Sequence, residues 1–362
     1  MKKDQEQLLS NLISIPSPSG YEGKLVAFIK QELSSVIAPE NISIDFHNNL
    51  IVKIKGQTDK IVMVDTHSDT VGAIIYNITK EGYITLSGLG GHDLSLLRGR
   101  KVLIITEKQT KIIKGVIGTK HAHLIEEGEE KDEIPLKISD LTVDIGIRRK
   151  NKVMKYVSIG DPVVIKSDLA NLTEDYWVAG GMDDKIGCYI LIKTIQEVVK
   201  RFTGAEPLPT LYFAFSSQEE IGSKGAKELV RKYKPSLFVG IDVTFASDCY
   251  EIDEREIGKC ELNKGVMITN GVNIHQPSLD LIQEIVKDKK IRVQYQATNG
   301  DEGFNADDIA GENEGIRILN LGIPCRNLHS PVEIVNMNDV GESIKLLVEF
   351  LSNPKLKEAI EK

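Results

Sequence analysis

Hydrophobic and polar residues occur along the chain in patterns that predict both strands and helices. Continuous apolar runs such as Ile61–Val64 and Leu211–Phe215 are typical of strands that are covered on both faces. Apolar residues at helical spacing predict amphipathic helices over Asp4–Ile15 and Asp339–Ser352, and a further helix directly after Asp183. This mixture of buried strands and amphipathic helices predicts an α/β fold.

The segment from residue 70 to residue 166 has a different pattern. Short β-type segments recur there between glycines and charged turns, and no long helical pattern appears. The segment is therefore predicted to be an all-β barrel that is inserted into the α/β domain. Residues 1–69 and 167–362 would then form one discontinuous domain, and residues 70–166 would form the insertion.

Composition narrows the class of protein. The 362 residues, 41% of them hydrophobic, are enough for a large core. A formal net charge of −8 argues against nucleic acid as a partner, because phosphate binding requires clustered Lys and Arg. No apolar run approaches the ~20 residues that span a bilayer, and the first residues contain no apolar signal core. Four cysteines without paired spacing are typical of free thiols. We therefore expect a cytoplasmic protein without a nucleic-acid or membrane partner.

Side chains of the types that can bind metals follow several predicted strands, and one lies at the start of a predicted helix. They are His67, Asp69, Asp183, Glu219, Glu220, Asp242 and His329. Ligands of open α/β sheets bind outside the carboxyl ends of the strands, so we expect these side chains to meet there. Taken singly, a carboxylate at a helix start is usually a cap, and a histidine in a turn is usually polar surface. Together they suit zinc or cobalt, and a carboxylate-rich set suits two ions with one shared ligand.

Two short motifs allow a division of roles. Neighbouring residues on an extended backbone point in opposite directions, so Glu219 and Glu220 are expected to act differently. We interpret Glu220 as a metal ligand and Glu219 as a residue that moves a proton. His67 and Asp69 lie two residues apart, and a ligating histidine normally donates its other ring N–H to an acceptor such as a carboxylate. Asp69 is the candidate acceptor, although a structural hydrogen bond in a turn is the simpler explanation for this pair alone.

The ordered set of motifs resembles the tetrahedral aminopeptidase family of dinuclear metallopeptidases, whose members include glutamyl, leucyl and lysyl aminopeptidases. The motifs are His67-x-Asp69-x-x-Gly72, Asp183-Asp184-Lys185-x-Gly187, Gln218-Glu219-Glu220-x-Gly222, Asp242 and His329-Ser330-Pro331-x-Glu333. The match begins near Ser19-Gly20-Tyr21-Glu22 and continues almost to the C-terminus. The resemblance implies a mixed central sheet flanked by helices, of the zinc-peptidase type, with an inserted PDZ-like β-barrel domain that serves oligomerisation and substrate access.

The resemblance also implies a site and an activity. Asp183 would bridge two divalent ions, with His67 and Asp242 completing the ligands of one ion and Glu220 and His329 those of the other. Glu219 would be the general base, and Asp69 would orient His67. The ions would be Zn²⁺, with Co²⁺ or Mn²⁺ as alternatives. The substrates would be short peptides with a free N-terminus, and the partners would be further copies of the chain, typically twelve. The preferred N-terminal residue stays open.

Some positions depart from the family pattern or stand outside it. Asp184 and Lys185 replace a common asparagine and arginine, and Asn299–Asp308 matches only loosely, which concerns the substrate pocket rather than the metal ligands. His121 and His123 have metal-capable spacing but no ligand pattern around them, so we interpret them as a loop or subunit contact.

Three other functions make different demands on the same residues. A related two-metal amidohydrolase, of the N-deacylase or carboxypeptidase type, would have the same ligands and would differ in whether it requires a free amine. An endoglucanase needs two carboxyl groups that face each other at ~5–9.5 Å, whereas the neighbouring Glu219 and Glu220 are expected to diverge. A non-catalytic scaffold would have lost a ligand or Glu219, and none is lost.

Overall fold

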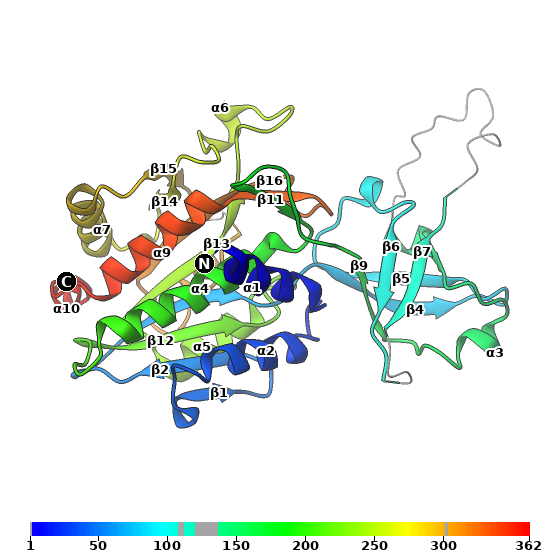
Figure 1. Ribbon diagram of the computed structural model, residues 1–362, viewed down its shortest axis with the longest axis horizontal. Helices are drawn as coiled ribbons and strands as arrows, with labels where there is room; N and C mark the ends of the chain where they lie inside the picture. Colours follow the sequence, from blue (N-terminus) through cyan, green and yellow to red (C-terminus); the bar gives the residue numbers. More distant parts are fainter. Residues whose placement is uncertain (1, 108–111, 120–136, 301–302) are drawn as a thin grey trace.

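The structure is a computed structural model that describes residues 2–107, 112–119, 137–300 and 303–362. In these residues the chain forms an 11-stranded mixed sheet flanked by helices and, beside it, a closed barrel of six antiparallel strands (Figure 1). The predicted fold class, an α/β mixed sheet with an inserted β-barrel, is therefore confirmed. The domain boundaries at residues 70 and 166 stay a prediction.

The order of strands brings four parallel strands to the middle of the sheet. Along its main path the sheet contains β1 (Ile42–Ile44), β2 (Leu50–Ile54), β12 (Pro209–Ser216), β3 (Thr58–His67), β13 (Leu237–Phe245), β16 (Ile318–Arg326), β17 (Glu333–Asn336), β11 (Tyr176–Ala179) and β10 (Ala170–Asn171). A branch adds β14 (Val266–Gly271) and β15 (Val293–Thr298). Because β12, β3, β13 and β16 are mutually parallel, their carboxyl ends open on the same edge.

Helices cover both faces of these central strands. On one face α4 (Met182–Arg201) packs against β3, β13 and α9 (Met337–Leu351), and α1 (Lys2–Ser14) and α2 (Gly23–Leu33) pack against α4. On the opposite face lie α8 (Asn305–Ile309) and α5 (Lys224–Tyr233). The other α-helices of the described residues are α3 (Lys150–Val153), α6 (Glu254–Ile257), α7 (Gln276–Lys289) and α10 (Leu356–Glu361), and short 3-10 helices lie at Pro39–Asn41, Leu94–Leu96 and Ile138–Asp140. None of the described helices is long and apolar enough to cross a membrane.

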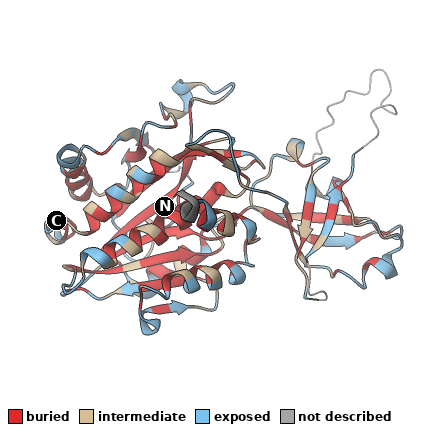
Figure 2. Cartoon of the chain, in the orientation of Figure 1, coloured by how far each residue is buried: buried red, intermediate tan, exposed pale blue. Residues whose placement is uncertain are grey.

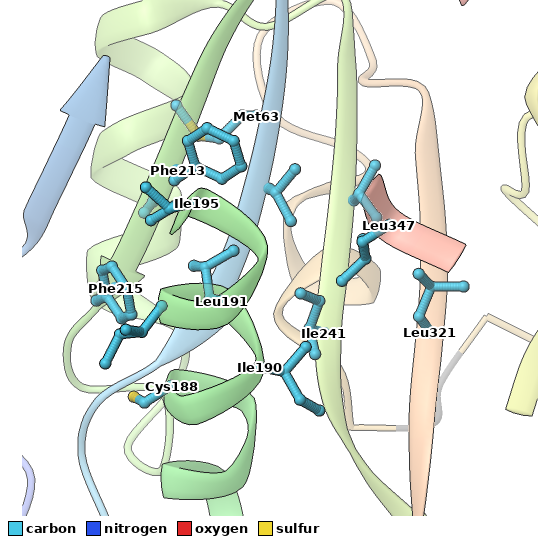
Figure 3. Close-up of a cluster of buried hydrophobic side chains, with 14 of the residues drawn as sticks. Met63, Cys188, Ile190, Leu191, Ile195, Phe213, Phe215, Ile241, Leu321 and Leu347 are labelled. Atoms are coloured by element: carbon cyan, nitrogen blue, oxygen red, sulfur yellow. The ribbon is translucent and has the colours of Figure 1, made fainter. Parts of the chain in front are cut away.

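The core lies between the sheet and α4. Figure 2 shows buried residues concentrated in the central strands and on the inner sides of the helices. Phe213 of β12 is fully buried there, beside Ile195 of α4 (Figure 3). The apolar runs of the sequence are thus strands covered on both faces.

Truncating this core is expected to destabilise the fold. Phe213→Ala should lower the free energy of unfolding by about 3–5 kcal/mol, because it removes a buried ring and leaves a cavity. Phe46, which is 95% exposed, provides the control. Phe46→Ala should change stability by no more than about 0.5 kcal/mol. Denaturant unfolding of both variants checks the prediction, and equal effects would contradict it.

The barrel has a small core of its own. Around the barrel the strands follow the order β4 (Gly72–Ile78), β5 (Ile84–Leu89), β8 (Thr142–Asp144), β7 (Ile113–Ile117), β6 (Lys101–Ile104) and β9 (Pro162–Ile165). The short β-type segments that the sequence predicts, at residues 73–78, 83–86, 102–106, 112–117 and 163–165, fall on all of these strands except β8, which is only three residues long. His121 and His123 lie outside the described residues.

Candidate metal centre and active site

The side chains singled out in the sequence come from five places in the fold. His67 ends β3, Asp69 follows it, Asp183 lies in the first turn of α4, Glu219 and Glu220 lie between β12 and α5, Asp242 lies in β13, and His329 follows β16. The parallel order of β12, β3, β13 and β16 brings these positions to one edge of the sheet. Asp242 lies inside its strand rather than after it, because β13 continues to Phe245.

Asp183 lies between two imidazoles. Its Oδ1 is 2.9 Å from Nε2 of His67, and its Oδ2 is 3.1 Å from Nε2 of His329. Each oxygen of one carboxylate therefore faces a different histidine. Two groups of ligand atoms result, His67–Asp183–Asp242 and Asp183–Glu220–His329, and within each group all atoms lie within 4.8 Å of one another. Asp183 belongs to both groups.

Burial makes this collection of carboxylates costly without cations. Burial and the Asp183 carboxylate raise the pKa of Glu220 well above its usual range, and burial also raises the pKa of Asp242. For Asp183, burial would raise the pKa, but hydrogen bonds from His329 and His67 outweigh it and the pKa lies below its ordinary value.

One oxygen of Glu220 supports the same conclusion. Its Oε1 is buried and has no hydrogen-bond partner among the described residues. A divalent cation would satisfy such an oxygen and neutralise the clustered charge, and imidazole with carboxylate is a donor set that divalent metals accept. The residues present therefore fit metal ions.

Asp69 holds the main chain of the two glutamates. Its buried carboxylate accepts the N–H of Glu219 at 2.9 Å and the N–H of Glu220 at 3.2 Å. It also accepts the hydroxyl of Ser19 at 2.7 Å. The Nδ1 of His67 lies 3.0 Å from the main-chain oxygen of Asp69 and 3.5 Å from its Oδ1. The main-chain carbonyl of Asp69 is thus the nearer partner of the imidazole, while its carboxylate holds the Glu219–Glu220 turn.

Glu219 lines a cleft next to both groups. The cleft has a volume of about 390 Å³. It is lined by Glu219, the five candidate metal ligands and a wall of Gly91, Val243, Thr244, Phe245, Gly303 and Leu328. Burial is the main reason that the pKa of Glu219 is raised to about 8. A carboxyl group of raised pKa, adjacent to candidate metal ligands, is suited to accept and donate protons near neutral pH.

The barrel also contributes to the site. The loop after β5 packs so closely that a methyl group on Gly90 would lie 3.0 Å from Oε2 of Glu220. A methyl group on Gly91 would lie 3.4 Å from Nδ1 of His329. Sequence reasoning did not place this loop at the metal centre, because glycines carry no ligand atoms and the loop belongs to the insertion.

Comparison with known proteins identifies the family. Residues 48–346 match the M42 glutamyl aminopeptidase family. The chain belongs to this family. Its M42 membership confirms the resemblance seen in the sequence and makes the protein a hydrolase of the aminopeptidase class.

Individual relatives are similar to this chain over nearly their whole length. The lysyl aminopeptidase of Pyrococcus furiosus is 28% identical over 352 residues, which are 96% of this chain and 97% of the relative. A TET aminopeptidase from a marine sediment Thaumarchaeota archaeon superposes with a TM-score of 0.90 at 25% identity, covering 99% of both chains. The TET1 peptidase of Pyrococcus horikoshii, which can assemble into a tetrahedron or a large octahedral shell, has a TM-score of 0.84 at 30% identity, covering 96% of this chain and 99% of that one.

Two of the positions that depart from the expected family motifs make structural contacts around α4. Asp184 is buried, contacts the hydroxyl of Thr66 and accepts the N–H of Gly187 at 2.9 Å. Lys185 is buried and donates to the main-chain oxygen of Ile15 at 2.5 Å. Both side chains therefore join α4 to neighbouring elements. In the loosely matching segment 299–308, Gly303 lines the cleft.

Proposed function

We propose that this M42 member is a dinuclear metallo-aminopeptidase that releases N-terminal residues from short peptides, with Glu219 as general base. In this proposal His67 and Asp242 hold one ion, Glu220 and His329 hold the other, and Asp183 bridges them. The observation that carries the proposal is that the two oxygens of Asp183 face two separate histidines. Zn²⁺ is the proposed ion, with Co²⁺ or Mn²⁺ as alternatives that metal supply would decide.

The ions, when bound, would supply Lewis-acid chemistry that polarises the scissile carbonyl and lowers the pKa of the attacking water. The chain's own residues supply the proton transfer. The carboxylate of Glu219 would take a proton from the attacking water and pass it to the amine of the leaving peptide. The pKa of Glu219, about 8 without cations, would fall when nearby positive charge favours the ionised form. Asp69 would hold Glu219 in place through its main-chain N–H.

The free amine of the substrate distinguishes this function from that of a two-metal amidohydrolase. We propose that the α-amino group binds beside the carboxylates of the cleft, where an acylated nitrogen would lose its charge and its hydrogen bonds. An aminoacyl anilide should therefore be hydrolysed at least about 10²-fold faster than its N-acetylated form. Comparing the two substrates at equal enzyme concentration checks this. Release of acetate from the blocked anilide would favour an N-deacylase, and release of C-terminal residues from an N-blocked peptide would favour a carboxypeptidase.

We also propose that residues 70–166 form an oligomerisation and substrate-access domain, and that copies of the chain associate, twelve to an assembly. Two observations support this. The barrel folds around its own core and extends away from the sheet (Figure 1). The similar TET1 peptidase of Pyrococcus horikoshii can assemble into a tetrahedron or a large octahedral shell.

A further inference from the structure

The turn between α1 and α2 lies behind the loop that carries the two glutamates. Glu22 accepts the main-chain N–H of Gln218 at 3.2 Å, although the two residues are 196 positions apart in the sequence. The same Oε1 of Glu22 accepts the N–H of Gly20 at 2.7 Å, which fixes the shape of the turn. Ser19, from the same turn, donates to Asp69. The side chains that make these bonds are buried, namely those of Ser19, Glu22 and Asp69.

The glutamate loop is held by side chains at consecutive main-chain positions. The N–H of Ser217 donates to Asn49 at 2.8 Å. The N–H groups of the next three residues donate to Glu22 and, twice, to Asp69. Gln218 has a positive φ of 57°, a conformation that side chains other than glycine rarely adopt and that surrounding contacts must maintain. The position of the Glu219 main chain is therefore set by hydrogen bonds from outside its loop.

We propose that Ser19 and Glu22 are positioning residues for Glu219. Ser19 fixes the carboxylate of Asp69, which fixes the N–H of Glu219, and Glu22 fixes the preceding N–H of Gln218. Neither residue touches the cleft, so each acts only through these bonds. The inference rests on the proposed role of Glu219 as general base. Misplacing a catalytic group by about 1 Å can lower the rate by about 10²-fold, which makes such support consequential.

Ser19→Ala tests the contacts that run from Ser19 through Asp69 to the main chain of Glu219. We expect kcat to fall by roughly 10- to 10²-fold, while KM and bound metal stay within about twofold of the parent values. Ser17→Ala is the matched control, because Ser17 is buried in the same turn and its hydroxyl has no hydrogen-bond partner among the described residues. The control should keep the parent kcat. A Ser19→Ala enzyme with parent kcat, or one that loses its metal in parallel, would overturn the proposal.

A pair of substitutions tests Glu22. Glu22→Gln keeps an oxygen that can accept the N–H of Gln218 and should retain most of the parent kcat. Glu22→Ala removes that acceptor and should lower kcat by about 10-fold or more. Equal activity of the two variants would show that the bond to Gln218 does not matter for turnover. This comparison remains decisive if Ser19→Ala fails to fold.

A double-mutant cycle separates this inference from the proposed function. If Ser19 acts through Glu219, Ser19→Ala should lower the residual rate of Glu219→Gln by less than about twofold. A full additional loss in that background would mean that Ser19 acts elsewhere and would refute the positioning role. Parent-level turnover by Glu219→Gln alone would instead refute the general-base assignment.

Discussion

Glu219→Gln is expected to lower kcat by about 10²–10⁴-fold while the variant binds metal like the parent. Glutamine has nearly the same shape as glutamate but cannot accept a proton from water. The substitution keeps the main-chain N–H that donates to Asp69, so the loop should keep its conformation. The loss should therefore appear in kcat and leave metal content unchanged.

Anilide hydrolysis under saturating substrate, together with elemental analysis of the same samples, measures both quantities. Glu228→Gln is a suitable control, since Glu228 lies on the neighbouring helix α5 and its carboxylate lies beside His47, away from the cleft. The control should retain full kcat. Hydrolysis by Glu219→Gln at the rate of the parent would remove Glu219 from the mechanism.

Asp183→Asn is expected to weaken both metal positions at once. Loss of a residue that only supports a ligand costs about 10–100-fold in metal affinity, so losing a shared ligand should cost at least about 10²-fold. The reason is geometric: the two oxygens of Asp183 face His67 and His329, and an amide replaces one of them with a neutral nitrogen that donates hydrogen bonds.

Dialysis against a chelator, followed by titration with Zn²⁺, Co²⁺ or Mn²⁺, measures affinity and stoichiometry for both enzymes. Asp339→Asn is the control for loss of a buried carboxylate, because Asp339 accepts the N–H groups of Asn263 and Gly265 away from the cleft. That control is expected to lose stability but to keep its ions. Two ions bound to Asp183→Asn with parent affinity would contradict the bridging role.

The sequence was sufficient for the architecture because continuous apolar runs have few alternatives to buried strands. Ile61–Val64 and Leu211–Phe215 mark the interiors of β3 and β12, although both strands are longer than the runs. Their carboxyl ends escaped the pattern because buried hydrogen bonds and candidate ligands, rather than apolar side chains, occupy them. Asp242 was predicted to follow its strand because it is polar, whereas β13 continues beyond it to Phe245.

The candidate ligands could be named from the sequence because each is a polar residue at a predictable place in the fold. The hydrogen bonds that support these ligands could not be predicted from the sequence. Ser19 contacts Asp69 across 50 positions and Glu22 contacts Gln218 across 196, and hydrogen bonds over such separations leave no periodic signal. The closeness of Gly90 to Glu220 depends on how the barrel packs on the sheet, which local patterns do not encode.

Gly90, in the loop after β5, limits how freely the barrel can be exchanged between relatives. Because a Cβ on Gly90 would lie only 3.0 Å from Oε2 of Glu220, and because its φ of +81° favours glycine, a transplanted insert with a larger side chain there would crowd that carboxylate. The insertion therefore forms part of the cleft wall as well as a separate fold, and a chimaera would need to keep a glycine at position 90.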